Sequence, residues 1–172
     1  MVQLYILRHG EAGTRMPAGG SDSKRALTVT GEEEVKEIAQ ALSALGLKLD
    51  FMASSPLERA RQTARIVAKV LKVKKGSFEE WDELKPEGRR ADLYRRLAQF
   101  KPETSVMIIG HEPYLSTVAG EIVFGSSIGS RIVLKKAGLA KVAITSFQPK
   151  VKGELRWLLA PKHMKRMAAV KR

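Results

Sequence analysis

Three short apolar runs, each followed at once by polar residues or glycine, restrict the fold of this chain more than any other feature. Apolar runs of this length are typical of strands buried on both faces of a parallel sheet. Helical segments separate them, and right-handed crossovers then bring the carboxyl ends of all three strands to one edge, where ligands bind in open α/β folds. The runs are 5–7, 49–53 and 105–109, followed by Arg8-His9-Gly10, Ser54-Ser55 and Gly110-His111.

Two of the connecting segments carry clear helix signals. The first is expected to begin at a capping box over 30–33 and to end at Gly46. The second is expected to begin with Ser55 as its N-cap and Pro56 as its first helical residue. Further helices are predicted over 90–100 and after Pro113, and loops over 11–29 and 78–88.

The last part of the chain changes character, because short strand-like runs follow one another without long helices between them. We predict strands over 131–134, 140–147 and 153–159, and a frayed helix or a disordered tail after Pro161. The expected organisation is one domain over 1–161 with a basic C-terminal tail over 162–172. The predicted fold is α/β, a single-domain three-layer α/β/α sandwich with a mostly parallel central sheet.

The composition excludes several kinds of chemistry. Cysteine is absent, which rules out disulfides, thiolate catalysis and cysteine-ligated metals, and the presence of only three histidines makes a zinc site unfavourable. No run approaches the roughly 20 apolar residues that cross a bilayer, and no targeting signal precedes the first strand. We therefore expect a cytoplasmic protein with no membrane partner, no metal and no cofactor.

The formal net charge of +13 is the unusual feature of the composition. The segment from Lys162 to Arg172 contributes Lys and Arg residues and no acid. Such a surplus attracts acidic or phosphorylated partners, and weak polyanion binding through the basic surface is one expectation. Aromatic residues make up only 6% of the chain and form no basic-aromatic stripe of the kind that stacks bases, so most of the charge is expected to be solvated.

His9 and His111 are the strand-end residues with the most useful chemistry. An imidazole nitrogen can attack phosphorus, and the adjacent Arg8 can hold two phosphoryl oxygens in its planar fork. A second anion site is expected where the second helix begins, close to either Arg59 or Arg61, because helix N-termini favour negative charge. Either histidine alone could serve only local hydrogen bonding, but together they favour phosphoryl transfer, with arginines supplying the positive charge.

The order of these motifs resembles the histidine phosphatase superfamily, which includes phosphoglycerate mutases and acid phosphatases. The matching motifs are Arg8-His9-Gly10, the segment 55–64 (SPLERARQTA) and Gly110-His111-Glu112-Pro113. The segment 21–31 is similar to the Asp-x-x-Arg-Pro-Leu-Thr-x-x-Gly segment of SixA-type phosphohistidine phosphatases, with Ala26 in place of proline. The resemblance covers most of the chain and implies a phosphoglycerate-mutase-like fold.

The same resemblance implies roles for individual residues. His9 is expected to be the nucleophile that accepts the phosphoryl group. The resemblance also selects Arg59 over Arg61, which spacing alone leaves open. The expected phosphate ligands are Arg8, Arg25, Arg59 and His111.

One departure from the family bears on the substrate. The mutase-like branch carries a glutamate general acid in the region where this chain has Leu84-Lys85-Pro86. A phosphomonoester needs a proton donor to expel its alkoxide, whereas the imidazole of phosphohistidine can leave protonated. The chain is therefore expected to favour phosphohistidine. Acids elsewhere could still donate the proton, and these are Glu112 and Glu11 as the preferred candidates, then Glu83 and Glu87.

The expected function is that of a metal-independent phosphohistidine phosphatase in signal transduction, whose partner is a phosphorylated protein. The first alternative is a phosphomonoesterase of the same superfamily that acts on small phosphorylated molecules or nucleotides. The second alternative is a polyanion-binding module in which the basic tail is the functional element.

Overall fold

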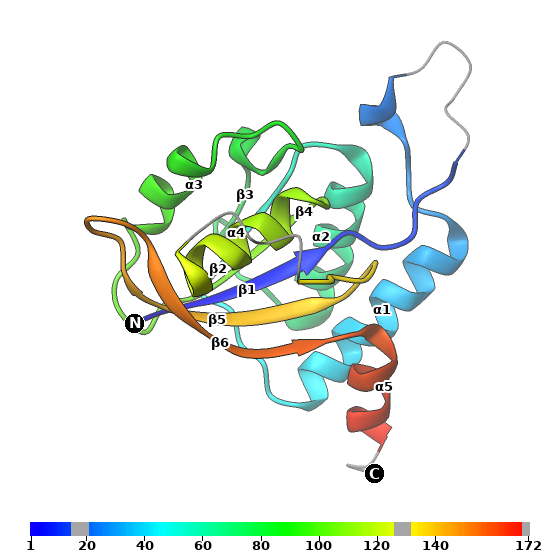
Figure 1. Ribbon diagram of the computed structural model, residues 1–172. Coiled ribbons are helices and arrows are strands. Elements are labelled where there is room, and N and C mark those ends of the chain that lie inside the picture. Colours follow the sequence, from blue (N-terminus) through cyan, green and yellow to red (C-terminus); the bar gives the residue numbers. More distant parts are fainter. Residues whose placement is uncertain (15–20, 126–131, 170–172) are drawn as a thin grey trace.

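The computed structural model describes residues 1–14, 21–125 and 132–169, and in these residues six strands form one sheet. The order of the strands across the sheet is β3-β2-β4-β1-β5-β6 (Figure 1). Their bounds are β1 (Val2–Arg8), β2 (Phe51–Ser54), β3 (Phe78–Glu80), β4 (Ser105–Gly110), β5 (Leu139–Ser146) and β6 (Lys152–Leu159).

Four neighbouring strands are parallel, the three that the apolar runs predicted and β3, which was not predicted. β4 pairs in parallel with β1 on one side and with β2 on the other, and β3 pairs in parallel with β2. In this register Arg8 lies opposite Gly110, and Ser54 lies opposite Ile109. The prediction that the three carboxyl ends meet at one edge of the sheet is therefore confirmed. β5 and β6 are antiparallel to their neighbours.

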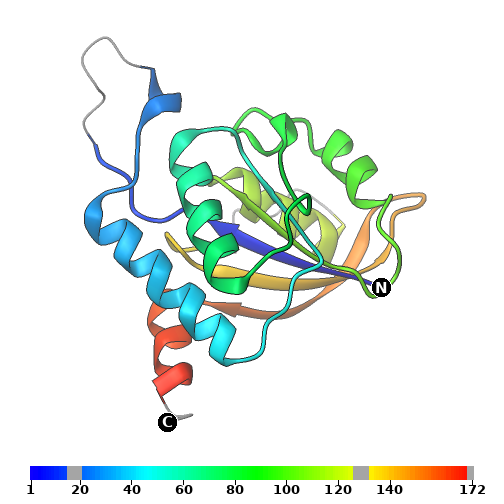
Figure 2. The ribbon, with the colours of Figure 1, turned by 180° about the vertical axis from the view of Figure 1, so that it is seen from behind.

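Helices cover both faces of this sheet (Figure 2). The helices α1 (Val29–Ala44), α2 (Glu58–Leu71) and α5 (Pro161–Ala169) lie on one face, and α3 (Arg90–Leu97) and α4 (Tyr114–Phe124) lie on the other. Two separate apolar clusters result, one on each side of the strands. The predicted three-layer α/β/α arrangement with a mostly parallel sheet is confirmed.

The first helix begins two residues earlier than the capping box predicted. Thr28, not Thr30, is the N-cap, and its hydroxyl oxygen accepts a hydrogen bond of 3.0 Å from the backbone N–H of Gly31. Gly31 thereby lies inside the first turn, where a Cβ atom would overlap the carbonyl group of Glu11. Close contact with the preceding loop, and not the capping box, sets this helix start.

The second helix begins later than predicted. Its N-cap is Leu57, so the prediction of Ser55 as the cap is wrong. The Ser55 hydroxyl oxygen accepts a hydrogen bond of 3.3 Å from the backbone N–H of Leu57, and it also lies 2.8 Å from Nε2 of His111. Ser55 therefore closes a local turn and contacts His111, the residue after β4, and does not cap the helix.

Two further predictions need correction. The predicted loop over 78–88 contains β3 and the short 3-10 helix η2 (Asp82–Leu84). No strand forms over 132–134 in the described part of the predicted segment 131–134, and Arg131 lies outside the described residues. Leu134 instead lies in a connecting segment, where its side chain is buried and its carbonyl accepts a hydrogen bond from Arg8.

The basic C-terminal segment begins as a packed helix. Within α5, the Met164 side chain is fully buried against the α1 side of the sheet, and Lys165 forms an ion pair of 3.0 Å with Glu37 of α1. Residues 161–169 are thus part of the folded body, whereas residues 170–172 lie outside the described residues. Among the described helices, none is both long and apolar enough to cross a membrane. The cytoplasmic location stays a prediction.

Candidate functional site

His9 and His111 follow the adjacent parallel strands β1 and β4 and come together at the carboxyl edge. Their ring centroids are 5.1 Å apart, with the ring planes inclined at 53°. The backbone N–H of His9 donates to the carbonyl of Gly110 at 3.1 Å, which continues the pairing of the strands one residue beyond β1. Both side chains are buried, with 7% of His9 and 2% of His111 exposed. The strand pairing therefore fixes the separation of the two rings.

The hydrogen bond of the His9 ring determines which nitrogen can react. Nδ1 of His9 lies 2.7 Å from the carbonyl oxygen of Gly10. Because a carbonyl oxygen can only accept, Nδ1 must carry a proton in this contact. In the neutral ring the lone pair is then on Nε2, which is the nitrogen available for nucleophilic attack.

The site keeps both histidines neutral at physiological pH. Burial lowers the pKa of His9 to about 4, and the cations of Arg59, Arg8 and Arg25 act in the same direction, against the raising effect of the Gly10 carbonyl. Burial also lowers the pKa of His111 to about 3, assisted by His9 and the same arginines. A neutral His9 suits a nucleophile, because protonation would occupy the lone pair on Nε2.

His111 is oriented by Ser55, which follows β2. The Ser55 hydroxyl lies 2.8 Å from Nε2 of His111, whereas Nδ1 of His111 is buried without a hydrogen-bond partner among the described residues. If the hydroxyl donates to Nε2, the proton of the neutral ring is on Nδ1. That N–H group can then donate to an anion beside His9.

Thr63 of α2 anchors the turn that carries His9. Its hydroxyl oxygen accepts from the backbone N–H of Gly10 at 3.1 Å and donates to the carbonyl of Arg59 at 2.7 Å. Glycine is required at position 10, since a Cβ atom there would lie 2.6 Å from Cγ2 of Val35. The loop after β1 therefore packs tightly between α1 and α2, and the carbonyl that orients His9 is held in place.

Arg8 and Arg59 bring guanidinium groups to the same edge. Nη1 of Arg8 donates to the carbonyl of Leu134 at 3.0 Å. Arg59 is only 4% exposed and donates to Asp22, from Nη1 to the backbone oxygen and from Nη2 to Oδ2, both at 3.0 Å. Burial lowers the pKa of Arg59, and Asp22 counters this effect. Arg59 is thus a buried cation with one exposed carboxylate beside it.

Arg25 reaches the site from the segment before α1. Its Nε atom lies 3.2 Å from Oδ1 of Asp22, the residue that also binds Arg59. The structure thus brings together every expected phosphate ligand around His9 and His111. Arg61, the residue that spacing alone could not separate from Arg59, instead forms ion pairs with Glu58 and Glu80.

The carboxyl edge is rich in hydrogen-bond donors without acceptors. Within the described residues, four buried nitrogen atoms in this region have no hydrogen-bond partner. Buried polar groups normally have a partner, and a cluster of N–H donors with positive charge suits a tetrahedral oxyanion. These atoms are Nε of Arg8, Nε of Arg25, Nε of Arg59 and Nδ1 of His111, although Nε of Arg25 is within ion-pair distance of Asp22. Nε of Arg90, beside the cavity at the opposite edge, is likewise without a hydrogen-bond partner in the described residues.

The two preferred proton-donor candidates differ in their surroundings. Glu112 follows His111 and accepts a hydrogen bond of 3.1 Å from the backbone N–H of Ser116. Burial raises the pKa of Glu112, partly offset by the Ser116 hydroxyl, by Arg8 and by the backbone bond. Glu11 is exposed and forms an ion pair of 3.1 Å with Lys136. A carboxyl group that holds its proton more readily and lies near Arg8 is the better donor, so the geometry favours Glu112.

The segment in which the mutase-like branch has its acid does lie beside the site. A Cβ atom on Gly110 would lie 3.2 Å from the carbonyl oxygen of Leu84, so η2 packs over the end of β4. Lys85 forms an ion pair of 2.8 Å with Asp82, and Glu83 accepts from Nε of Arg96 at 2.8 Å. The two acids of this segment are thus already paired with cations.

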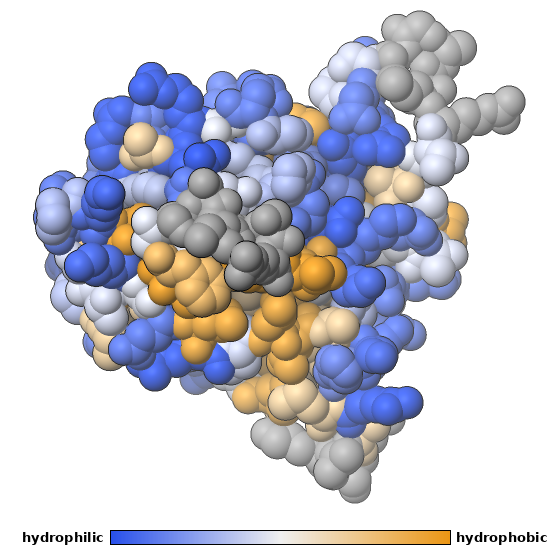
Figure 3. Space-filling model, viewed as in Figure 1, coloured by the Kyte–Doolittle hydropathy of each residue, from blue (hydrophilic) through white to orange (hydrophobic). Residues whose placement is uncertain are grey.

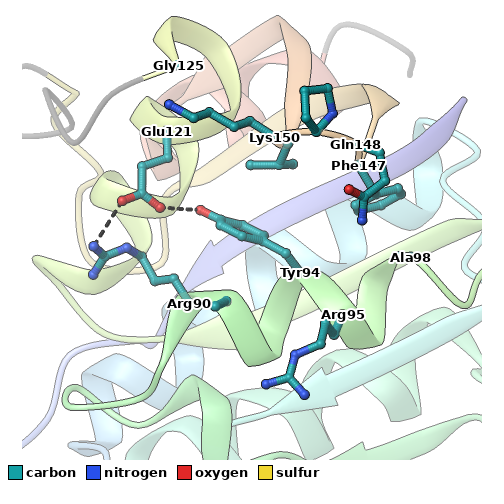
Figure 4. Close-up of a pocket in the computed structure, with 12 residues that line it drawn as sticks. Arg90, Tyr94, Arg95, Ala98, Glu121, Gly125, Phe147, Gln148 and Lys150 are labelled. Atoms are coloured by element: carbon teal, nitrogen blue, oxygen red, sulfur yellow. Dashed lines mark hydrogen bonds and ion pairs between the residues drawn. The ribbon is translucent and has the colours of Figure 1, made fainter.

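A cavity elsewhere in the molecule is not part of this site. Its volume is about 530 Å³, and it lies between α3, the end of α4 and the turn from β5 to β6 (Figure 4). That turn is at the opposite edge of the sheet, because Ile144 of β5 pairs with Val2 at the start of β1. Within the described residues no group of three or more His, Asp or Glu side chains could hold a metal ion.

Comparison with known families agrees with this geometry. Residues 4–123 match the model of the histidine phosphatase superfamily, branch 1. The chain belongs to this superfamily. It is therefore a phosphatase by family, and its fold is the phosphoglycerate-mutase-like fold of its relatives.

Several relatives match along nearly the whole chain. An uncharacterized protein of Picosynechococcus sp. is 34% identical over 94% of this chain and 98% of its own length. The phosphohistidine phosphatase SixA of Escherichia coli is 26% identical over 98% of this chain and 100% of its own length. A solved structure of the protein histidine phosphatase SixA complexed with tungstate superimposes with a TM-score of 0.82, at 27% identity, covering 95% of this chain and 99% of that one. The resemblance to SixA-type proteins is confirmed.

Sequence reasoning missed three residues that support the site. Ser55 was interpreted as a helix cap, yet its hydroxyl contacts His111. Thr63 belongs to the matching segment 55–64, but nothing in the sequence indicated its role, because a threonine inside a helix normally bonds to its own backbone. Asp22 was part of a recognised motif, and the missed signal was its spacing of three residues from Arg25, which brings the two side chains together.

Proposed function

We propose that the protein is a metal-independent phosphohistidine phosphatase that acts on a phosphorylated protein through a covalent phosphohistidine on His9. The observation that carries this proposal is a neutral His9 whose Nδ1 is bound to the carbonyl of Gly10, which leaves the lone pair on Nε2, beside a cluster of N–H donors. This arrangement provides a nucleophile and a binding site for the phosphoryl oxygens in the same place.

The reaction has two steps. The lone pair on Nε2 of His9 forms a bond to phosphorus while the bond from phosphorus to the substrate imidazole breaks, and the departing ring takes up a proton. Water then attacks phosphorus, which releases inorganic phosphate and returns His9 to its neutral form. In both steps Arg8, Arg59 and His111 stabilise the charge on the equatorial oxygens.

The arginines support a reaction without a metal ion. Phosphoryl transfer mainly requires positioning and positive charge around the equatorial oxygens. In this protein the guanidinium groups of Arg8, Arg25 and Arg59 are the cations that act on His9 and His111. We expect excess chelator to leave kcat unchanged, and a loss of activity restored by a divalent metal would contradict this part of the proposal.

Two features favour a protein bearing phosphohistidine as the substrate. The segment 84–86 contributes no acid, and the imidazole leaving group of phosphohistidine has the least need of one. Apolar side chains also gather on the face shown in Figure 3, and Val133, Leu155 and Leu158 are exposed apolar residues. Val133 is 64% exposed and adjoins Leu134, the residue whose carbonyl binds Arg8. An exposed apolar area that begins beside the phosphate site suits a folded substrate.

The experiment that tests the proposal is trapping of the phosphoenzyme. Brief reaction with a protein labelled on phosphohistidine should give an acid-labile, alkali-stable label on the wild-type enzyme. His9→Ala should give no label and no measurable turnover. The matched control is His163→Ala, because His163 is exposed on α5 and far along the chain from the site. Normal turnover by His9→Ala would refute the covalent mechanism.

The raised pKa of Glu112 supports a second candidate, a phosphomonoesterase that acts on small molecules or nucleotides. In that case Glu112 would protonate the alkoxide, and Glu112→Gln would lower kcat/KM strongly for phosphomonoesters. For a phosphohistidine substrate the same variant should change kcat/KM little. Comparing the two substrate classes on wild-type enzyme and on Glu112→Gln decides between the candidates.

A further inference from the structure

Asp22 contacts two of the arginines in the candidate site, and no other acid in the described part of the chain does so. It lies in the short 3-10 helix η1 (Asp22–Lys24), and half of its side chain is exposed. Its backbone oxygen and Oδ2 accept from Arg59, and Oδ1 lies 3.2 Å from Nε of Arg25. A single residue therefore holds two guanidinium groups that would otherwise repel each other.

The contacts to Arg59 occupy only part of its guanidinium group. Asp22 binds Nη1 and Nη2, which form the outer end of the fork. Nε of Arg59 is buried and has no hydrogen-bond partner in the described part of the chain. A guanidinium group carries five N–H donors, so the edge formed by Nε and an adjacent Nη stays available for two anion oxygens. Asp22 and a phosphoryl group can thus bind Arg59 together.

We propose that Asp22 is a positioning residue that holds Arg59 and Arg25 in the geometry that binds the phosphoryl group. It acts through the arginines and does not itself touch the substrate. The effect on turnover rests on the proposed function, whereas the effect on anion binding does not. The alternative hypothesis is that Asp22 acts as an internal anion that competes with phosphate for Arg59.

The two readings predict opposite signs for Asp22→Asn. Loss of a negative charge alone should strengthen anion binding, because the local positive charge rises. Loss of positioning should weaken it, because long arginine side chains lose their fixed orientation. We expect the loss of positioning to affect anion binding more than the loss of charge does. Asp22 is half exposed, so its charge is screened, whereas Arg59 is buried.

The principal experiment measures the binding of inorganic phosphate and of tungstate by calorimetry. Asp22→Asn should weaken both by about tenfold, and it should raise KM by a similar factor with a smaller change in kcat. The loss should persist at about 1 M salt, where long-range charge effects are screened. The segment should stay in place in this variant, because Gln62 of α2 also accepts from the backbone N–H of Leu27 at 2.7 Å.

Asp82→Asn is the matched control. Asp82 begins the other short 3-10 helix and pairs with Lys85 three residues later, just as Asp22 pairs with Arg25, but it is 79% exposed. This variant should leave phosphate binding unchanged. In an Arg25→Gln background, Asp22→Asn should weaken binding by less than it does in the wild type, because one of its two cations is then gone.

Three results would overturn the proposal. They are tighter or unchanged phosphate binding in Asp22→Asn, equal losses in Asp22→Asn and Asp82→Asn, and full additivity with Arg25→Gln. If Asp22→Asn weakens anion binding while wild-type enzyme gives no phosphoenzyme, the proposed function fails and the positioning role stands. Thermal unfolding of each variant confirms that binding is compared between folded proteins.

Discussion

The two edges of the sheet differ in how their buried charges are balanced. At the carboxyl edge, the three arginines Arg8, Arg25 and Arg59 lie near two neutral histidines, and among the described residues Asp22 is the acid that pairs with Arg25 and Arg59. At the opposite edge, Glu121 accepts from Arg90 at 2.9 Å and from the hydroxyl of Tyr94 at 2.6 Å, and these groups line the cavity of Figure 4.

A cavity does not by itself indicate an anion site. The opposite edge has a cavity of about 530 Å³, and Arg90 there is paired with Glu121. The carboxyl edge brings three arginines together with Asp22 as their paired acid in the described residues, and Nδ1 of His111 is buried there without a hydrogen-bond partner. Uncompensated charge at a buried position costs stability and persists only where something offsets it, so this edge is the better candidate for an anion site.

The largest expected effect is the difference in activity between an arginine variant at the carboxyl edge and one at the opposite edge. Arg59→Ala should lower kcat/KM by about 100-fold to 1,000-fold, because it removes a buried donor to the phosphoryl oxygens. Arg90→Ala should change kcat/KM by less than about twofold, since it lies beyond the site, and should mainly lower the melting temperature. Steady-state kinetics and thermal unfolding of both variants check the contrast. Similar losses of kcat/KM in Arg59→Ala and Arg90→Ala would contradict the proposed difference between the two edges.

The second effect is the dependence of stability on pH. The pKa of His9 falls from 6.5 to about 4 on folding, and that of His111 falls to about 3, so between these values the unfolded chain binds more protons. Their contribution to the free energy of unfolding is therefore complete above about pH 6.5 and is lost as the pH falls towards 4, by an amount on the order of 3 kcal/mol for His9.

Urea unfolding at a series of pH values measures this dependence. His9→Gln and His111→Gln should each flatten the decline in stability between pH 6.5 and 4. His163→Gln, which alters the exposed histidine on α5, serves as the control and should leave the slope unchanged. Equal slopes in all three variants would show that the decline comes from other groups, such as paired carboxylates.

The third effect tests how His111 is oriented. Ser55→Ala removes the hydroxyl that contacts Nε2 of His111, and we expect kcat/KM to fall by about tenfold, the equivalent of one hydrogen bond. Thr117→Ala is the control, because its hydroxyl on α4 donates to the carbonyl of Pro113 and not to a histidine. An unchanged kcat/KM in Ser55→Ala would mean that strand pairing alone orients the ring.

The strands that carry the site could be predicted because their signal is local. Continuous apolar runs ending in Arg8-His9 and Gly110-His111 require burial, and the parallel connections leave one arrangement of their ends. The helix starts could not be predicted to the residue, since contacts from distant segments decided them. Glu11 packs against Gly31, and His111 competes for the hydroxyl of Ser55.

The supporting residues escaped prediction for the same physical reason. The hydroxyl of Thr63 matters only because Gly10, distant in the sequence, lies against it. The packing of α5 depends on Met164, a single apolar residue in a basic segment, meeting the apolar side of α1. Local pattern thus predicted the candidate residues that meet at the carboxyl edge, whereas the residues that hold them in place depend on tertiary contacts.

The smallest expected effect comes from removing one hydroxyl group at each edge, that of Thr63 and that of Tyr94. Thr63→Val leaves the N–H of Gly10 without its acceptor, and Tyr94→Phe leaves Glu121 with one donor fewer. Each should lower the free energy of unfolding by about 1–2 kcal/mol. Only Thr63→Val should also lower kcat/KM, because Gly10 provides the carbonyl that holds Nδ1 of His9. If Thr63→Val loses stability but keeps full activity, the orientation of His9 does not depend on α2, and the turn after β1 is sufficient to hold the nucleophile.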